Sequence, residues 1–101
     1  MNIFQRRELE AAIAWATAGN QALHLMEGSF AYLQKRTPSC FKGRKQIAHL
    51  FDNDESRLIA TARRLGVHVI KVERRGWKEG QHIDLCGKPL ETAILEAELL
   101  A

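Results

Sequence analysis

The segment spanning residues 46–72 constrains the fold more than any other part of this 101-residue chain. Residues 54–65 carry apolar side chains at helical spacing, and Gly66 follows where a glycine commonly ends a helix. The apolar stripe consists of Leu58, Ile59, Ala62 and Leu65. Residues 46–51 and 67–72 are short and apolar, as expected of buried strands. A strand, a helix and a second strand in this order predict a parallel βαβ unit with a right-handed crossover.

Helical patterns also occur at both ends of the chain. One helix is predicted over residues 4–18, and another from Pro89, whose ring suits the first turn of a helix. Residues 82–86 alternate like a short strand, whereas residues 22–26 and 30–33 fit either a hairpin or a second helix. We therefore expect one α/β domain over residues 1–101, with a mixed sheet of about four strands flanked by the two terminal helices. Its predicted core is Ile13, Leu50, Leu58, Ile59, Leu65, Val67, Val69, Leu85, Ile94 and Ala97.

The overall composition is that of a globular domain, with 46% apolar and 27% charged residues. No run approaches the roughly 20 apolar residues of a membrane span. The first 18 residues include two acids, which a signal peptide lacks, so a cytoplasmic protein with no membrane partner is expected. The two cysteines are far apart in the sequence, which argues against a zinc site built from cysteines.

The modest net charge of +3 conceals a strongly basic middle segment. Residues 35–78 contain 12 basic and 4 acidic residues, whereas the rest of the chain contains 3 basic and 8 acidic residues. Such asymmetry favours an acidic partner, either nucleic acid or an acidic protein. An ordinary solvated surface is the alternative interpretation.

One basic stretch, residues 71–82, combines cations with an aromatic ring. It includes Arg74, Arg75, Trp77 and Lys78. Cationic side chains can contact phosphates while a tryptophan stacks on a base, so these residues are candidates for ligand binding. Alternatively, Trp77 packs onto the core and the cations are merely solvated.

Two histidines and an aspartate are the candidate catalytic residues. In an extended segment, His82 and Asp84 point to the same side of the strand. His49 lies near the end of another predicted strand, and Asp52 follows it closely. If these side chains meet, they suit zinc, manganese or magnesium, or a histidine that acts as a general base. The alternative interpretation is a helix cap formed by Asp52 with Glu55, together with a structural histidine.

Motifs for nucleotide binding and for nucleophilic serine chemistry are absent from the sequence. It contains neither a glycine-rich dinucleotide fingerprint nor a P-loop. Asp52, Asp54 and Glu55 at the start of the predicted helix would repel a phosphate group. No nucleotide or other cofactor is therefore predicted.

The part of the chain between residues 49 and 94 resembles a family of small bacterial and phage domains, the domain of unknown function 4031. The matching residues are His49-Leu50-Phe51, Leu58, Ala62-Arg63-Arg64-Leu65-Gly66 and His82-Ile83-Asp84-Leu85. Ile83 stands where the family has an aromatic residue, and residues 1–45 lie outside the resemblance. The resemblance implies a bacterial or phage origin and singles out His49, Arg64, His82 and Asp84. It assigns them no activity, because the family has none established.

Three functions remain open from the sequence. The first is a basic binding module for nucleic acid or another acidic partner. The second is a metal-assisted hydrolase or nuclease that uses His49, His82 and Asp84. The third is a protein-interaction scaffold without chemistry. A homo-oligomer is also open, with the apolar residues 30–33 as a candidate contact.

Overall fold

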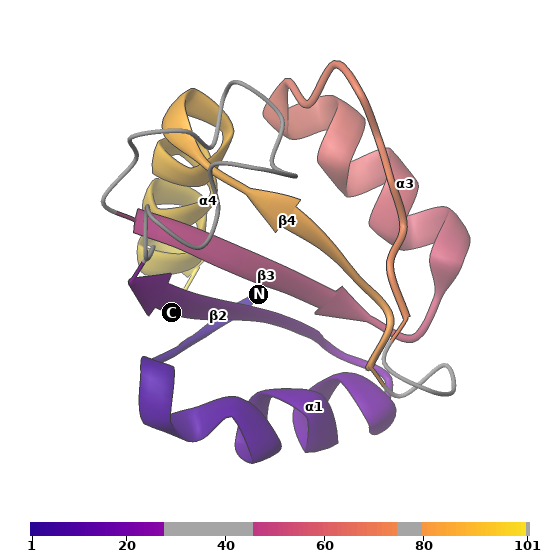
Figure 1. Ribbon diagram of the computed structural model, residues 1–101, viewed down its shortest axis with the longest axis vertical. Helices are drawn as coiled ribbons and strands as arrows, with labels where there is room; N and C mark the ends of the chain where they lie inside the picture. The colour runs from indigo at the N-terminus through magenta and orange to yellow at the C-terminus, as the bar shows by residue number, and fades with distance from the viewer. Residues whose placement is uncertain (28–45, 75–79, 101) are drawn as a thin grey trace.

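The computed structural model describes residues 1–27, 46–74 and 80–100 (Figure 1). Four strands in these residues form one sheet in the order β1–β2–β3–β4. The strands are β1 (Asn2–Phe4), β2 (Gln21–Glu27), β3 (Gln46–Asp52) and β4 (His82–Leu85). The helices are the 3-10 turn η1 (Arg6–Glu8), α1 (Leu9–Thr17), α3 (Glu55–Leu65) and α4 (Gly87–Leu100). Because β1 is parallel to β2 and the other neighbours are antiparallel, the predicted α/β fold with a mixed sheet is confirmed.

Strand alternation gives the sheet one strongly apolar face, which α3 and α4 cover (Figure 1). The buried strand residues on this face are Leu23, Ala48, Leu50, Ile83 and Leu85. The helices contribute Leu58, Ala62, Leu65, Leu90 and Ala93. Each fully buried leucine stabilises the fold by about 1.5–3 kcal/mol relative to an exposed one. This layer therefore supplies most of the hydrophobic stabilisation and holds β3 and β4 rigidly side by side.

Among the described residues, α1 covers part of the opposite face of the sheet. Ala12 and Ala16 of α1 pack against Ala22 and Phe51 of the sheet. Short alanine side chains allow the helix backbone to approach the strands closely. Figure 1 shows α1 on the side of the sheet away from α3 and α4. Three histidines and one aspartate also lie on this face: His24, His49, His82 and Asp84.

Helix α3 confirms the helix predicted over residues 54–65, although its N-terminal cap differs. The helix ends at Leu65, and Gly66 adopts a left-handed conformation with φ of 94°. The capping side chain is Asp54, which accepts a hydrogen bond from the backbone N–H of Arg57. The predicted cap at Asp52 is wrong, because that residue still belongs to β3.

The strand predicted over residues 67–72 is wrong, and with it the parallel unit formed by residues 46–51, 54–65 and 67–72. The edge of β3 on that side is already occupied by antiparallel β4. Val67, Ile70 and Val72 pack against the core without joining the sheet, which explains the apolar pattern. Val69, a predicted core residue, is 84% exposed. The parallel crossover lies instead at the N-terminus, where α1 connects β1 to β2.

The remaining predicted elements are mostly confirmed. The α-helix expected over residues 4–18 begins at Leu9. Asn2–Phe4 instead form β1, which pairs with β2. Residues 22–26 belong to a strand, whereas residues 30–33 lie outside the described part of the chain. The C-terminal helix and the short strand at residues 82–85 are present. Within the described ranges, no helix has both the length and the apolar character needed to cross a bilayer.

The other predicted core residues are at least partly buried. Those that are buried are Leu50, Leu58, Leu65, Leu85 and Ala97. Those that are intermediate are Ile13, Ile59, Val67 and Ile94. The predicted core is therefore largely confirmed, with Val69 as the error.

Candidate metal centre

Three potential metal ligands from β3 and β4 converge on the polar face of the sheet. His49 of β3 is paired directly with Asp84 of β4, and Phe51 is paired with His82. Residues two apart in a strand share a face, so His82 lies diagonally across from His49. One side-chain ligand atom from each of His49, His82 and Asp84 lies within 4.8 Å of the others. The structure thus brings together the three residues that the sequence singled out on two separate segments.

The separations between these atoms fit a metal ion better than they fit direct hydrogen bonds. Oδ1 of Asp84 lies 3.5 Å from Nε2 of His49 and 3.5 Å from Nε2 of His82. A hydrogen bond between an imidazolium and a carboxylate is closer to 2.8 Å. Ligand atoms about 2 Å from a tetrahedral zinc ion are, by contrast, about 3.3 Å apart. The two carboxylate–imidazole separations are therefore closer to the spacing of ligand atoms around an ion than to that of a hydrogen bond.

His82 is oriented by a backbone carbonyl. Its Nδ1 lies 2.8 Å from the oxygen of Gly80, which can only accept a hydrogen bond, so Nδ1 carries the proton. In the neutral ring, the lone pair is then on Nε2, the nitrogen that faces Asp84. Histidines that bind metals are commonly held in this way by an outer carbonyl.

An apolar floor lies beneath the two histidines. The ring of Phe51 is 5.4 Å from that of His49 and 5.2 Å from that of His82, centroid to centroid. The side chain of His82 is only 6% exposed and that of His49 is 17% exposed. That of Asp84 is 35% exposed, so the cluster opens to solvent at the aspartate. Low polarity beneath the cluster strengthens any electrostatic interaction within it.

One oxygen of the Asp84 carboxylate, Oδ1, is buried although the side chain as a whole is partly exposed. Within residues 1–27, 46–74 and 80–100, no hydrogen-bond donor satisfies its buried Oδ1. Burial raises the pKa of Asp84, attraction to His82 lowers it, and the nearby negative charge of Glu73 raises it. A divalent cation bound here would stabilise the ionised carboxylate.

A second carboxylate, from Glu73, lies at the edge of the cluster. The backbones of Glu73 and His82 exchange two hydrogen bonds of 2.8 Å in an isolated antiparallel bridge. This bridge places Oε2 of Glu73 at 3.7 Å from Nε2 of His82. Lys71 is near the other carboxylate oxygen, with 3.6 Å between Nζ and Oε1. Sequence reasoning missed Glu73 because its role depends on a bridge outside the regular strands.

His24 is the other residue of this face that the sequence did not single out as functional. It lies opposite His49 in the β2–β3 ladder, and the two rings stack with centroids 5.5 Å apart. The signal was available in principle, because alternation in a β2–β3 hairpin puts both histidines on one face.

Asp52, the further ligand considered from the sequence, does not belong to the cluster. It lies on the opposite face of β3, where it is fully buried and its carboxylate is satisfied. Nε and Nη2 of Arg57 donate to it at 2.6 and 2.7 Å. The side chain of Gln21 and the backbone N–H of Asp54 each donate at 2.9 Å. Asp52 therefore anchors the β3–α3 connection.

Two of the residues predicted to bind an acidic ligand, Arg64 and Arg74, are described by the structure, and both form ion pairs outside the cluster. Arg64 forms an ion pair with Glu96, linking α3 to α4 on the other face of the sheet. Arg74 lies 3.0 Å from Glu55 at the start of α3. Three further candidates lie outside the described residues: Arg75, Trp77 and Lys78.

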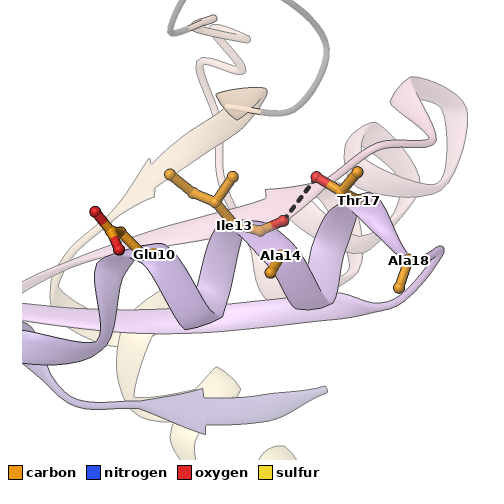
Figure 2. A pocket seen from close by; sticks show the side chains of 5 residues that line it. All are labelled: Glu10, Ile13, Ala14, Thr17 and Ala18. Atoms are coloured by element: carbon orange, nitrogen blue, oxygen red, sulfur yellow. Dashed lines mark hydrogen bonds between the residues drawn. The ribbon is translucent and has the colours of Figure 1, made fainter.

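A surface hollow elsewhere on the molecule offers little chemistry. It lies along α1 and is lined by Glu10, Ile13, Ala14, Thr17 and Ala18 (Figure 2). The hydroxyl of Thr17 donates to the carbonyl of Ile13 at 2.8 Å, so it is already used within the helix. Glu10 alone contributes a charge, so the histidine cluster is the better candidate site.

Comparison with models of known protein families, with curated proteins and with solved structures gives no match for this chain. The resemblance of residues 49–94 to the domain of unknown function 4031 therefore stays a prediction. Any function must follow from the geometry of the cluster itself.

Proposed function

We propose that this protein is a divalent-metal-dependent hydrolase in which His49, His82 and Asp84 bind the ion. The observation that carries the proposal is the convergence of the three ligand atoms within 4.8 Å. The poorly satisfied carboxylate of Asp84 and the carbonyl-oriented ring of His82 support it. A structural cluster would more commonly have its polar atoms already hydrogen-bonded.

The donor set favours zinc or manganese over magnesium. Two imidazole nitrogens and one carboxylate oxygen suit borderline metals, whereas magnesium prefers oxygen ligands throughout. Three protein ligands are also the usual number in a catalytic zinc site, where the fourth position is left for water. When bound by His49, His82 and Asp84, such an ion would lower the pKa of a water molecule to about 7 and so provide a nucleophile near neutral pH.

We assign Glu73 the role of general base in this reaction. Its carboxylate is half-exposed and lies beside the cluster, 3.7 Å from Nε2 of His82. A carboxylate beside the water position can accept the proton as water attacks the substrate. Lys71, close to Glu73, adds a positive charge at the open side of the site.

The basic middle of the chain suggests an anionic substrate, and we infer a phosphodiester in nucleic acid. Residues 35–78 contain 12 basic and 4 acidic residues. In the sequence, Arg75 and Lys78 lie between Glu73 and Gly80. Glu73 and Gly80 each form a hydrogen bond with His82. In this proposal, Arg75 and Lys78 bind the phosphate groups of the substrate, and the metal site cleaves it.

The test is hydrolysis by the full-length protein after treatment with EDTA. Zinc or manganese is added back, and cleavage of bis(4-nitrophenyl) phosphate and of single-stranded DNA and RNA is measured. We expect cleavage that depends on metal and is lost in Asp84→Asn. The matched control Asp54→Asn should remain active, because asparagine also caps helices well. Binding of nucleic acid without cleavage under any metal would contradict the hydrolase and favour the simple binding module.

A further inference from the structure

The buried histidine of β2, His24, contacts both the backbone of η1 and the ring of His49. His24 is 2% exposed, and its ring lies between the backbone of η1 and the ring of His49. Nε2 of His24 is 3.0 Å from the carbonyl oxygen of Arg6. Nδ1 of His24 is 3.4 Å from Nδ1 of His49. The two rings are nearly parallel, with an interplanar angle of 22°.

These contacts fix the positions of the ring protons, because each hydrogen bond needs one donor and one acceptor. The carbonyl of Arg6 can only accept, so Nε2 of His24 carries a proton. In a neutral imidazole the other nitrogen, Nδ1, is then an acceptor. Its partner, Nδ1 of His49, must be the donor. Neutral His49 therefore has its lone pair on Nε2, which lies 3.5 Å from Oδ1 of Asp84.

We propose that His24 is a positioning residue that holds His49 in the tautomer and ring orientation required to bind the metal ion. The metal-binding part of this inference rests on the proposed function, whereas the tautomer of His49 does not. His82 obtains the same tautomer directly from the carbonyl of Gly80. His49 obtains this tautomer indirectly. The Arg6 carbonyl sets the tautomer of His24, and Nδ1 of His24 in turn accepts the proton of Nδ1 of His49 in a hydrogen bond. Both Nε2 lone pairs then point toward Asp84.

Two amide substitutions separate the two hydrogen bonds of His24. In His24→Asn, the amide oxygen occupies roughly the position of Nδ1 and can still accept a hydrogen bond from His49. In His24→Gln, the amide group reaches roughly the position of Nε2 and can contact Arg6, but no acceptor is left beside His49. His24→Phe keeps the ring and removes both polar atoms. All three variants are checked for folding by circular dichroism and thermal denaturation.

The first measurement is the tautomer of His49 in the metal-free protein, read from nitrogen-15 chemical shifts in long-range proton–nitrogen correlation spectra. We expect a protonated Nδ1 and an unprotonated Nε2 in the wild type and in His24→Asn, and a mixture of tautomers in His24→Phe. A proton on Nε2 in the wild type, or an unchanged tautomer in His24→Phe, would overturn the inference. This readout needs no bound metal, so it is independent of the proposed function.

The second measurement is the affinity of the same proteins for cobalt(II), followed by its visible absorption. Removing an outer-sphere partner of a metal ligand typically lowers affinity by about 10–100-fold. We expect a loss of that size in His24→Phe and His24→Gln and a smaller loss in His24→Asn. Equal affinities across all four proteins would overturn the positioning role. No cobalt binding in the wild type, combined with the expected tautomer, would instead refute the metal-dependent function.

Discussion

His49 and Asp84 lie directly opposite each other in the antiparallel ladder of β3 and β4, with 3.5 Å between Nε2 and Oδ1. His82 joins them from the same face of β4, two residues before Asp84. All three side chains thus project from regular strands, whose reverse face is packed against α3 and α4. A site supported in this way is held in place without rearrangement of a loop.

Replacing Asp84 with asparagine should stabilise the metal-free protein at neutral pH. Burial raises the pKa of this carboxyl in the folded state, so its negative charge opposes folding above that pKa. The contribution of Asp84 to the free energy of unfolding is therefore most favourable below the ordinary pKa of aspartate. It is lost as the pH rises through the raised pKa of the folded protein. We expect the melting temperature of Asp84→Asn to exceed that of the wild type at pH 7. The gap should close as the pH is lowered, and a less stable variant at pH 7 would contradict the account.

The role of His82 can be divided by comparing two substitutions. Its ring is buried beside Phe51 and donates to the carbonyl of Gly80, so His82→Ala should cost about 1–3 kcal/mol. His82→Asn retains a donor near the position of Nδ1 and lacks a nitrogen at Nε2. Chemical denaturation should show a smaller loss of stability for the asparagine variant, whereas both variants should lose cobalt binding. Cobalt binding by His82→Asn at wild-type affinity would exclude Nε2 as a ligand.

Breaking the ion pair between Arg57 and Asp52 should affect folding without affecting the metal centre. Arg57→Met leaves the fully buried carboxylate of Asp52 without its cation, which should cost about 3 kcal/mol. The pair lies at the β3–α3 connection, on the other face of the sheet from His49 and His82. Urea denaturation should therefore show reduced stability, while a metal titration below the transition should match the wild type. Reduced metal affinity in the folded variant would show that the two faces are coupled.

Glu73→Gln should separate catalysis from metal binding. If Glu73 accepts the proton from water, loss of its basicity should lower kcat by about 100-fold or more. Metal affinity should change little, because the three ligands are intact. Single-turnover cleavage and metal titration on the same preparation test both statements, with Glu91→Gln on α4 as the matched control. A large loss of metal affinity would make Glu73 a ligand, whereas unchanged kcat would remove it from the mechanism.

The fold was predictable from sequence where local patterns and tertiary structure agree. The stripe of Leu58, Ala62 and Leu65, ended by Gly66, specified α3 because spacing and the glycine cap gave the same answer. The strand predicted over residues 67–72 is wrong because an apolar pattern indicates burial and does not indicate strand pairing. Val67, Ile70 and Val72 reach the core from an irregular segment, since β4 already occupies the edge of β3.

The candidate site was predictable only in part for a related reason. The alternation of His82 and Asp84 placed them on one face of a strand, and the structure retains that arrangement. Their approach to His49 depends on antiparallel pairing between segments that are about 30 residues apart. Glu73 depends on a single isolated bridge, and His24 on the register of β2 against β3. Local alternation shows which residues of one strand share a face, but it does not specify the partner strand or the register.

The most direct test of the metal centre is a calorimetric titration of zinc into the full-length protein at pH 7. One ion should bind per chain. Each of His49→Ala, His82→Asn and Asp84→Asn should lower the affinity by about 100-fold or more, which is at least the loss caused by removing an outer-sphere partner. His68→Ala, which removes an exposed histidine outside the cluster, should bind zinc like the wild type. Absence of zinc binding, or wild-type affinity in all three cluster variants, would contradict the central claim.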